Sequence, residues 1–106
     1  MYASITTVRS RDPDLDATAA MAAESMVGWL RDFDGYRGLL VVSDGDSGRA
    51  HVISFWDTLD DLDRSAHSRS QVRKELVDTA GAELEDVQAY AVVHVDGLDV
   101  PPADAR

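Results

Sequence analysis

Three side chains of this sequence have the chemistry and the predicted placement to act on a small molecule. Trp56 ends a predicted strand, where a large ring can form the floor of a cavity and stack on a flat ligand. His67 lies in the following helix, and its imidazole can act as a general base near neutral pH. Ser54 can donate or accept a hydrogen bond. We therefore take Trp56, His67 and Ser54 as candidate catalytic residues. The alternatives are a core or interface role for Trp56 and a solvent-facing position for His67.

A second set of residues is predicted to line an apolar pocket between the first helix and the sheet. Hydroxyls on strands can supply hydrogen bonds there, and methionines adapt to hydrophobic ligands. The alternative is that these side chains simply fill the sheet and the core. The candidate substrate-binding residues are Ser4, Thr6, Met26, Trp29, Val52 and Trp56.

The remaining histidines, His51 and His94, fall on predicted strands, where interface positions are the simplest interpretation. The three histidines have no metal-binding spacing, and the sequence contains no cysteine. The acidic clusters, such as Asp60 with Asp61, read as solvated surface near a helix N-terminus. We therefore predict no metal site and no cofactor.

The net charge of −10 limits the range of partners. It argues against nucleic acid, which needs a basic surface to neutralise phosphates, and against an anionic membrane surface. No run approaches the roughly 20 apolar residues of a membrane-spanning helix. The first residues have no signal-peptide pattern, so a cytoplasmic location is expected.

The elements that must position these residues follow the order β-α-β-β-α-β within one domain. Strands are predicted at 2–9, 36–43, 49–56 and 87–95, because these runs are rich in β-branched and aromatic residues. Apolar spacings of three and four predict a helix over 15–33. A second helix begins after Thr58, which precedes a capping-box sequence, and is interrupted near Ser68 or Ser70 before it reaches Gly81. The domain covers residues 2–96, and 97–106 form a tail.

The strand that ends in Trp56 carries apolar residues on both faces. Val52 and Trp56 point to one side, and Ile53 and Phe55 point to the other, because side chains alternate along a strand. Two helices can cover only one face of a four-stranded sheet. The other face then needs a partner, so we predict a homodimer joined through the sheets.

Two segments make the chain resemble the antibiotic biosynthesis monooxygenase domains. One is Phe33-Asp34-Gly35-Tyr36-Arg37-Gly38 at the entry to the second strand. The other runs from Ile53 to Leu62, where a strand ends in tryptophan and a helix begins. The resemblance covers about residues 2–96. It implies an α+β, ferredoxin-like βαββαβ fold with a four-stranded antiparallel sheet, which pairs into a dimeric α+β barrel.

The resemblance also implies functions. The first is a cofactor-independent monooxygenase that acts on a hydrophobic aromatic or polyketide-like molecule. Val52 stands where those oxygenases carry an asparagine on the face of the strand-end tryptophan. The second is a non-catalytic dimer that binds a small ligand. The third is haem degradation, for which the family uses an asparagine on the first strand; this chain contains no asparagine, and Ser65 and Glu75 stand at the helical positions.

Overall fold

The computed structural model describes residues 1–97, apart from the side chains of Glu75, Leu76, Thr79 and Ala80. Its elements are β1 (Tyr2–Arg9), α1 (Leu15–Leu30), β2 (Tyr36–Asp44), β3 (Arg49–Trp56), α2 (Leu59–Ala80) and β4 (Glu83–Ala91). The four strands form one antiparallel sheet in the order β2-β3-β1-β4. The predicted βαββαβ fold is confirmed.

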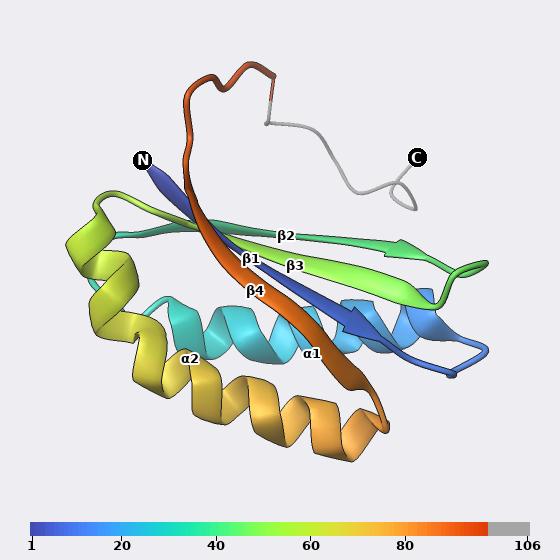
Figure 1. The fold of residues 1–106 in the computed structure, drawn as a ribbon. Helices are drawn as coiled ribbons and strands as arrows, with labels where there is room; N and C mark the ends of the chain where they lie inside the picture. The colour runs from blue at the N-terminus through green and yellow to red at the C-terminus, as the bar shows by residue number, and fades with distance from the viewer. Residues whose placement is uncertain (98–106) are drawn as a thin grey trace.

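Both helices lie on the same side of the sheet, and within residues 1–97 no helix covers its other face (Figure 1). The strand register places Tyr2, Ser4 and Thr6 of β1 on the helix side, opposite Trp56, Ser54 and Val52 of β3. The predicted alternation along β3 is therefore confirmed, since Trp56 and Val52 share the face that the helices cover.

The core lies where the two helices meet the Trp56 end of the sheet. Leu30, Trp56 and Leu62 are buried and form its centre. Partly buried neighbours pack around them: Tyr2, Met26, Trp29, Phe33, Tyr36 and Leu39. This cluster occupies only one end of the space between helices and sheet.

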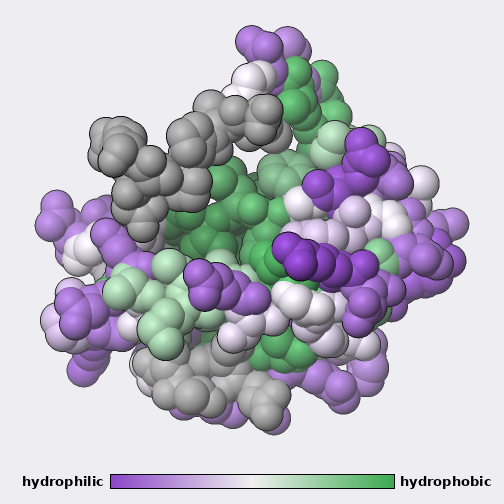
Figure 2. Space-filling model, turned by 180° about the vertical axis from the view of Figure 1, so that it is seen from behind, coloured by the Kyte–Doolittle hydropathy of each residue, from purple (hydrophilic) through white to green (hydrophobic). Residues whose placement is uncertain are grey.

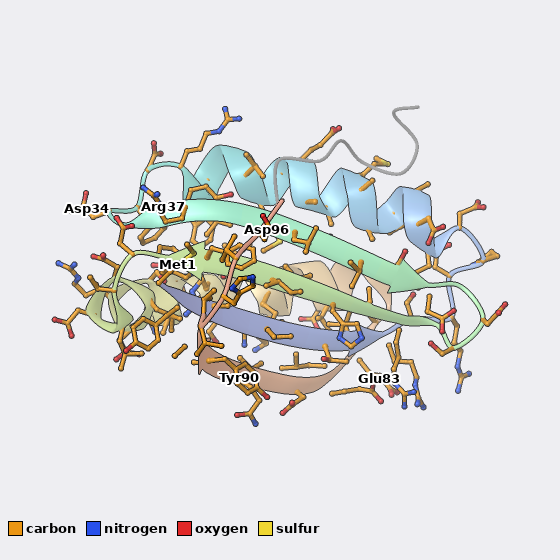
Figure 3. The ribbon with its side chains drawn as sticks, turned by 90° about the horizontal axis from the view of Figure 1, so that it is seen from above. Met1, Asp34, Arg37, Glu83, Tyr90 and Asp96 are labelled. Atoms are coloured by element: carbon orange, nitrogen blue, oxygen red, sulfur yellow. The ribbon has the colours of Figure 1, made fainter. Side chains whose placement is uncertain are left out.

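The uncovered face of the sheet carries apolar side chains. Leu40, Val42 and Tyr90 are 41%, 43% and 53% exposed. Seen from behind, hydrophobic surface gathers in a hollow above the helices (Figure 2). Viewed from above, Tyr90 lies near Met1 at one end of β4, and Glu83 lies at the other end (Figure 3). This face is as apolar as the sequence predicted for a two-sided sheet.

Three of the predicted elements differ from the structure by more than one residue. The first helix ends at Leu30 rather than near residue 33, and Gly35, with φ of +79°, serves the turn before β2. The second helix runs unbroken through Ser68 and Ser70, because that stretch contains no glycine or proline to interrupt its hydrogen bonds.

The last strand covers residues 83–91, not 87–95. Its limits follow those of its neighbour, because Glu83 pairs with Arg9 and Ala91 pairs with Tyr2. Beyond Ala91, β1 offers no further residues for pairing, although Val92 still donates to the carbonyl of Met1 at 2.9 Å. His94 therefore lies outside the strand, and most of the predicted tail, 98–106, lies outside the described residues.

Thr58 caps α2 as the sequence predicted. Its Oγ1 accepts a hydrogen bond from the backbone N–H of Asp61 at 3.0 Å and donates to the Asp61 carboxylate at 2.9 Å. The negative charge of Asp61 also lies in the first helical turn, where it is favoured by the helix dipole. This cap fixes where α2 leaves the end of β3.

The turn between β2 and β3 is tied to the chain between β1 and α1. The N–H of Ser10 donates to the carbonyl of Gly48 at 2.7 Å, and Gly48 has φ of +73°. A Cβ atom at Gly48 would lie 2.5 Å from the carbonyl oxygen of Ser10. Glycine is therefore required here both by the conformation and by the close approach of the two backbones.

We predict that Gly48→Ala lowers the free energy of unfolding by about 2 kcal/mol, because it adds a left-handed strain and a backbone clash. Gly45→Ala in the same turn is the matched control, since its Cβ would meet nothing within 4 Å. Urea unfolding of both variants checks this. Equal stabilities of the two variants would contradict the assigned role of Gly48.

Candidate functional site

A cavity of about 550 Å³ lies between α1, α2 and the helix side of the sheet. Its volume falls within the roughly 300–1,000 Å³ of typical small-molecule sites. Most of its wall is apolar, and α1 contributes Leu15, Ala19, Met21, Ala22, Met26 and Leu30. Val52 from β3, Val77 from α2 and Ala82, which follows α2, complete that surface. The pocket therefore suits a hydrophobic molecule.

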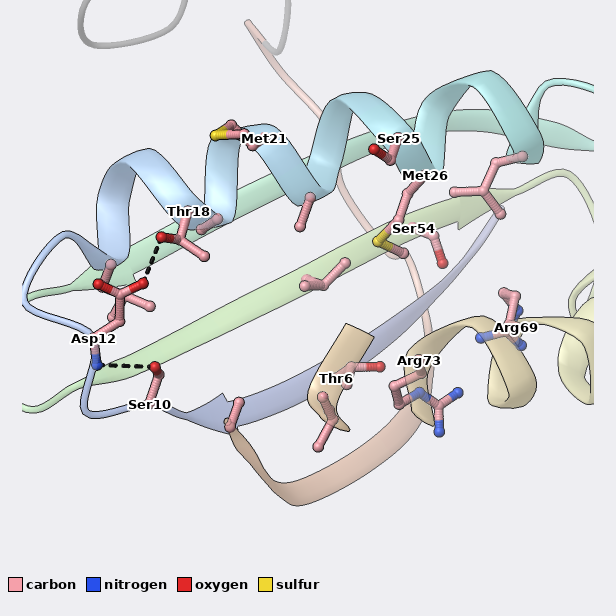
Figure 4. A pocket seen from close by; sticks show the side chains of 17 residues that line it. Thr6, Ser10, Asp12, Thr18, Met21, Ser25, Met26, Ser54, Arg69 and Arg73 are labelled. Carbon is pink, nitrogen blue, oxygen red and sulfur yellow. Dashed lines mark hydrogen bonds between the residues drawn. The ribbon is translucent and has the colours of Figure 1, made fainter. Parts of the chain in front are cut away.

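Four of the residues predicted for substrate binding or catalysis meet in this pocket. Thr6, Met26, Val52 and Ser54 all contribute to its lining (Figure 4). Thr6 and Val52 face each other directly across β1 and β3. The alternation of side chains along these two adjacent strands accounts for the meeting of Thr6 and Val52 on one face.

Trp56 lies beneath the pocket rather than on its wall. Its side chain is fully buried, and its Nε1 donates a hydrogen bond to the Ser54 hydroxyl at 2.9 Å. Its ring also meets the edges of Phe33 and Tyr36, with centroids 6.3 Å and 5.8 Å away. Trp56 thus acts on the pocket through Ser54, whose oxygen it holds in place.

The other predicted residues lie away from the cavity wall. Trp29 packs edge-on against Phe33 with centroids 5.0 Å apart. His67 is exposed on α2, with Nε2 3.3 Å from the Gln71 side-chain nitrogen, and is not part of the pocket lining. His51 lies on the uncovered face of the sheet, where Nδ1 is 2.9 Å from the Thr7 hydroxyl.

Arg69 is the central polar side chain of the site, and the sequence analysis missed it. The side chain is buried beside the pocket, with 8% of its surface exposed. Its Nε donates to Ser65 Oγ at 2.7 Å, one terminal nitrogen donates to Ser4 Oγ at 2.9 Å, and the other donates to the Leu62 carbonyl at 3.0 Å. Ser4, a predicted substrate-binding residue, is not part of the cavity lining and accepts a hydrogen bond from Arg69.

The guanidinium of Arg69 also lies over the Trp56 ring, 5.6 Å from its centroid. The pKa of Arg69 is lowered to about 10, first by burial and then by the nearby charge of Arg73, while the charge of Asp63 acts in the opposite direction. Arg73 lines the same pocket one helical turn later, and burial lowers its pKa as well. Two cations therefore share one end of an otherwise apolar pocket.

A signal for these arginines was present in the helical periodicity. Leu62, Ser65 and Arg69 follow one another at spacings of three and four, and this is the buried face of α2. An arginine on a core face is uncommon unless it is paired or hydrogen-bonded. That anomaly marks the position, although sequence alone does not give its partners.

The opposite end of the pocket is acidic. The Asp12 carboxylate accepts hydrogen bonds from the Thr18 hydroxyl at 2.5 Å and the backbone N–H of Asp14 at 2.8 Å (Figure 4). The Thr18 hydroxyl and then the Asp14 N–H lower the pKa of Asp12. The N–H of Asp12 donates to Ser10 Oγ at 3.1 Å. The pocket is therefore polarised along its length, from a carboxylate to two guanidinium groups.

Among the described side chains, which exclude that of Glu75, no cluster of three or more histidine, aspartate or glutamate residues has a geometry that would bind a metal ion. No helix within residues 1–97 is both long and apolar enough to cross a membrane. The described side chains that line the pocket supply hydroxyl groups, one carboxylate and two guanidinium groups, surrounded by apolar side chains.

We predict that Ser65→Ala lowers the free energy of unfolding by about 2 kcal/mol. The substitution removes the acceptor of the buried Nε–H of Arg69, and a charged donor left unsatisfied is costly. Ser70→Ala, at an exposed position of the same helix, is the control and should be nearly neutral. Chemical denaturation measures both; a neutral Ser65→Ala would contradict a stabilising role for the Arg69 contacts.

Comparison with known proteins supports the fold. The chain matches no family profile and no curated protein sequence. Among solved structures, it resembles a candidate antibiotic biosynthesis monooxygenase of Deinococcus radiodurans with a TM-score of 0.68 at 18% identity, covering 92% of this chain and 98% of that one.

Two further structures share the fold. A candidate antibiotic biosynthesis monooxygenase of Bordetella bronchiseptica has a TM-score of 0.63 at 15% identity and covers 88% of this chain and 97% of that one. A monooxygenase of Streptomyces coelicolor, solved in complex with the ligand nanaomycin D, has a TM-score of 0.63 at 14% identity, with 94% and 91% covered. These likenesses establish a shared fold over nearly the whole chain.

Proposed function

We propose that this chain belongs to the antibiotic biosynthesis monooxygenase family and that its pocket binds a flat, hydrophobic, aromatic or polyketide-like molecule. The observation that carries the proposal is the apolar cavity of about 550 Å³ between both helices and the sheet. The structural likeness to the Streptomyces coelicolor monooxygenase with its bound nanaomycin D supports it. An apolar wall interrupted by a few hydroxyls is typical of sites that orient such ligands.

The proposed reaction is a cofactor-independent oxygenation. The substrate loses a proton from an activated CH₂ group, and the resulting carbanion, delocalised as an enolate, reduces O₂. One oxygen atom enters the substrate as a new carbonyl, and the other leaves as water with the two hydrogens of the CH₂ group. The substrate itself supplies the electrons, so no external reductant is needed.

The side chains of the pocket define roles for this reaction. Ser54 is the proposed contact for the reacting oxygen atoms, because its hydroxyl lines the cavity and its oxygen already accepts from Trp56. Trp56 is a positioning residue. Positive charge from Arg69 and Arg73 would stabilise the enolate. The sequence makes His67 a candidate proton acceptor. Its position outside the pocket lining does not support that role.

A non-catalytic binding protein is the second candidate. Among the described side chains, the titratable groups that line the pocket are Asp12, Arg69 and Arg73. The pKa of Asp12 is lowered, which makes its carboxylate a weak base, and the guanidinium groups stay protonated. A pocket lined by these groups fits ligand binding better than acid–base catalysis.

We expect oxygen uptake with a dihydroxyanthrone above the rate of the protein-free buffer, and a loss of at least about tenfold in Ala22→Phe, which fills the pocket. Ala20→Phe is the matched control, because Ala20 is exposed on the same helix and does not line the cavity. An oxygen electrode records the rates, and circular dichroism checks folding.

Two results would decide between the candidates. No uptake above buffer, together with saturable quenching of tryptophan fluorescence by the anthrone, would replace the oxygenase with the binding protein. Equal rates in Ala22→Phe and Ala20→Phe would remove the pocket from either function.

We further propose that the chain forms a homodimer through the uncovered face of its sheet. The exposed Leu40, Val42 and Tyr90 on that face support this, since a contiguous apolar surface is costly to leave in water. A copy of the same face is complementary in its apolar character, and an isologous pair would remove both surfaces from solvent at once.

Sedimentation equilibrium at micromolar concentration should give a species of about twice the 11.5 kDa chain mass. We expect Leu40→Lys to shift this species to the monomer, because the substitution places a charge in the proposed interface. Ala20→Lys, on the exposed side of α1, should stay dimeric. A wild-type monomer, or a dimer unaffected by Leu40→Lys, would contradict the proposed sheet-to-sheet contact.

A further inference from the structure

The two arginines in the pocket have little to neutralise them. All three hydrogen-bond acceptors of Arg69 are uncharged, being the hydroxyls of Ser65 and Ser4 and the carbonyl of Leu62. Among the described side chains, neither Arg69 nor Arg73 takes part in an ion pair within 4.0 Å. Asp63 acts on Arg69 only through its more distant charge.

This arrangement is costly unless something offsets it. Two like charges one helical turn apart repel each other, and the effect is stronger where the surroundings exclude water. The lowered pKa of each guanidinium reflects this burial, and for Arg69 also the repulsion by Arg73. An anion bound in the pocket beside these two groups would offset both the cost of burying the charges and their mutual repulsion.

The two arginines differ in what they can offer to a ligand. Arg69 is fixed by three hydrogen bonds and by its position over Trp56. Arg73 lines the cavity (Figure 4), and among the described residues its guanidinium takes part in no ion pair within 4.0 Å. A guanidinium fork matches an acidic group with two oxygens in a bidentate geometry. Arg73 is therefore the group that is positioned to contact an anionic ligand directly. Arg69 adds a second positive charge nearby.

The charges at the two ends of the cavity favour one orientation of such a ligand. Asp12 and its hydrogen-bonded partner Thr18 occupy the opposite end of the cavity, where a second negative charge would be repelled. The chain as a whole carries a net charge of −10, so its general field does not attract anions. Recognition of an acid must therefore come from the local positive charge at the Arg69 and Arg73 end.

We propose that the ligand of this pocket is an amphiphilic acid, a flat hydrophobic molecule whose carboxylate or equivalent anionic group is bound by Arg73. Its apolar part then extends along Met26 and Val52 toward α1. The inference rests on the proposed ligand-binding role of the cavity, and it adds the chemical class of the molecule and the residue that selects it.

A pair of fluorescent probes that differ in one anionic group tests this. Anilinonaphthalene sulfonate carries a sulfonate, and N-phenylnaphthylamine has the same aromatic skeleton without it. Titration of each into the full chain gives two dissociation constants. We expect Arg73→Gln to weaken sulfonate-probe binding by about tenfold, the loss expected for a charge-assisted hydrogen bond, and to change neutral-probe binding by less than about twofold.

Two variants serve as controls. Arg64→Gln removes an exposed arginine of the same helix that pairs with Asp61, and it should change neither dissociation constant. Arg73→Lys keeps the charge and should retain part of the preference for the sulfonate probe. Circular dichroism confirms that each variant is folded.

The failures of the two proposals are distinguishable. If both probes bind the wild-type protein and lose affinity in Ala22→Phe, but Arg73→Gln leaves the ratio of their dissociation constants unchanged, the acid preference is overturned and the pocket stands. If neither probe binds, or if Ala22→Phe affects neither, the ligand pocket itself is overturned and the acid preference with it.

Discussion

The position of α2 over the sheet depends on one buried cation. Arg69 hydrogen-bonds to Ser65 and the Leu62 carbonyl on its own helix, and to Ser4 on β1. Its charge also lies over the ring of Trp56 at the end of β3. A buried guanidinium is stable only where its donors are satisfied, so these contacts fix both the rotation of α2 and its height above the strands. The end of the cavity formed by α2 is shaped by this requirement.

Trp56 links the core to the pocket without lining it. Its ring is fully buried with Leu30 and Leu62, while its single N–H donor is directed at Ser54. A buried indole N–H needs an acceptor, and here that acceptor is a hydroxyl on the same strand face. The core residue thus sets the orientation of a pocket hydroxyl, which leaves the hydrogen of Ser54 free to donate. A tryptophan that looks catalytic in sequence can in this way act through its neighbour.

The sequence predicted most of the fold because side chains alternate regularly between the two faces along the central strands β1 and β3. Parity along 49–56 placed Val52, Ser54 and Trp56 on one face, and the structure agrees. The predicted boundaries were wrong where the end of an element is set by the neighbouring element with which it pairs. Residues after Ala91 are β-prone, yet they lie beyond the end of β1 and have no strand to pair with. Ser68 and Ser70 suggested a helix break because serine often caps helices. The structure shows that α2 continues through both positions.

The site was harder to predict because its key residue is a charge in a core position. Thr6, Met26, Val52 and Ser54 were found because hydroxyls and apolar residues on an inward face need only local periodicity. Arg69 needs acceptors from both α2 and β1. Its acceptor on β1, Ser4, lies 65 residues away in sequence. No local pattern records such a pairing. The periodicity of α2 does mark Arg69 as an anomaly, and anomalies of this kind are where function is expected.

The two faces of the sheet are not independent. On β1, Ser4 and Thr6 point to the helix side, and Ile5 between them points to the uncovered face. β3 has the same alternation, with Ser54 inward and its neighbour Ile53 outward. A partner packed against the outward residues would restrain the backbone that carries the inward ones, because adjacent residues share peptide planes. Dimerisation through the open face would therefore hold Arg69, through Ser4, and the hydroxyl of Ser54 in fixed positions. The apolar outer surface and the inward hydroxyl groups of Ser4, Thr6 and Ser54 are two consequences of the same strands.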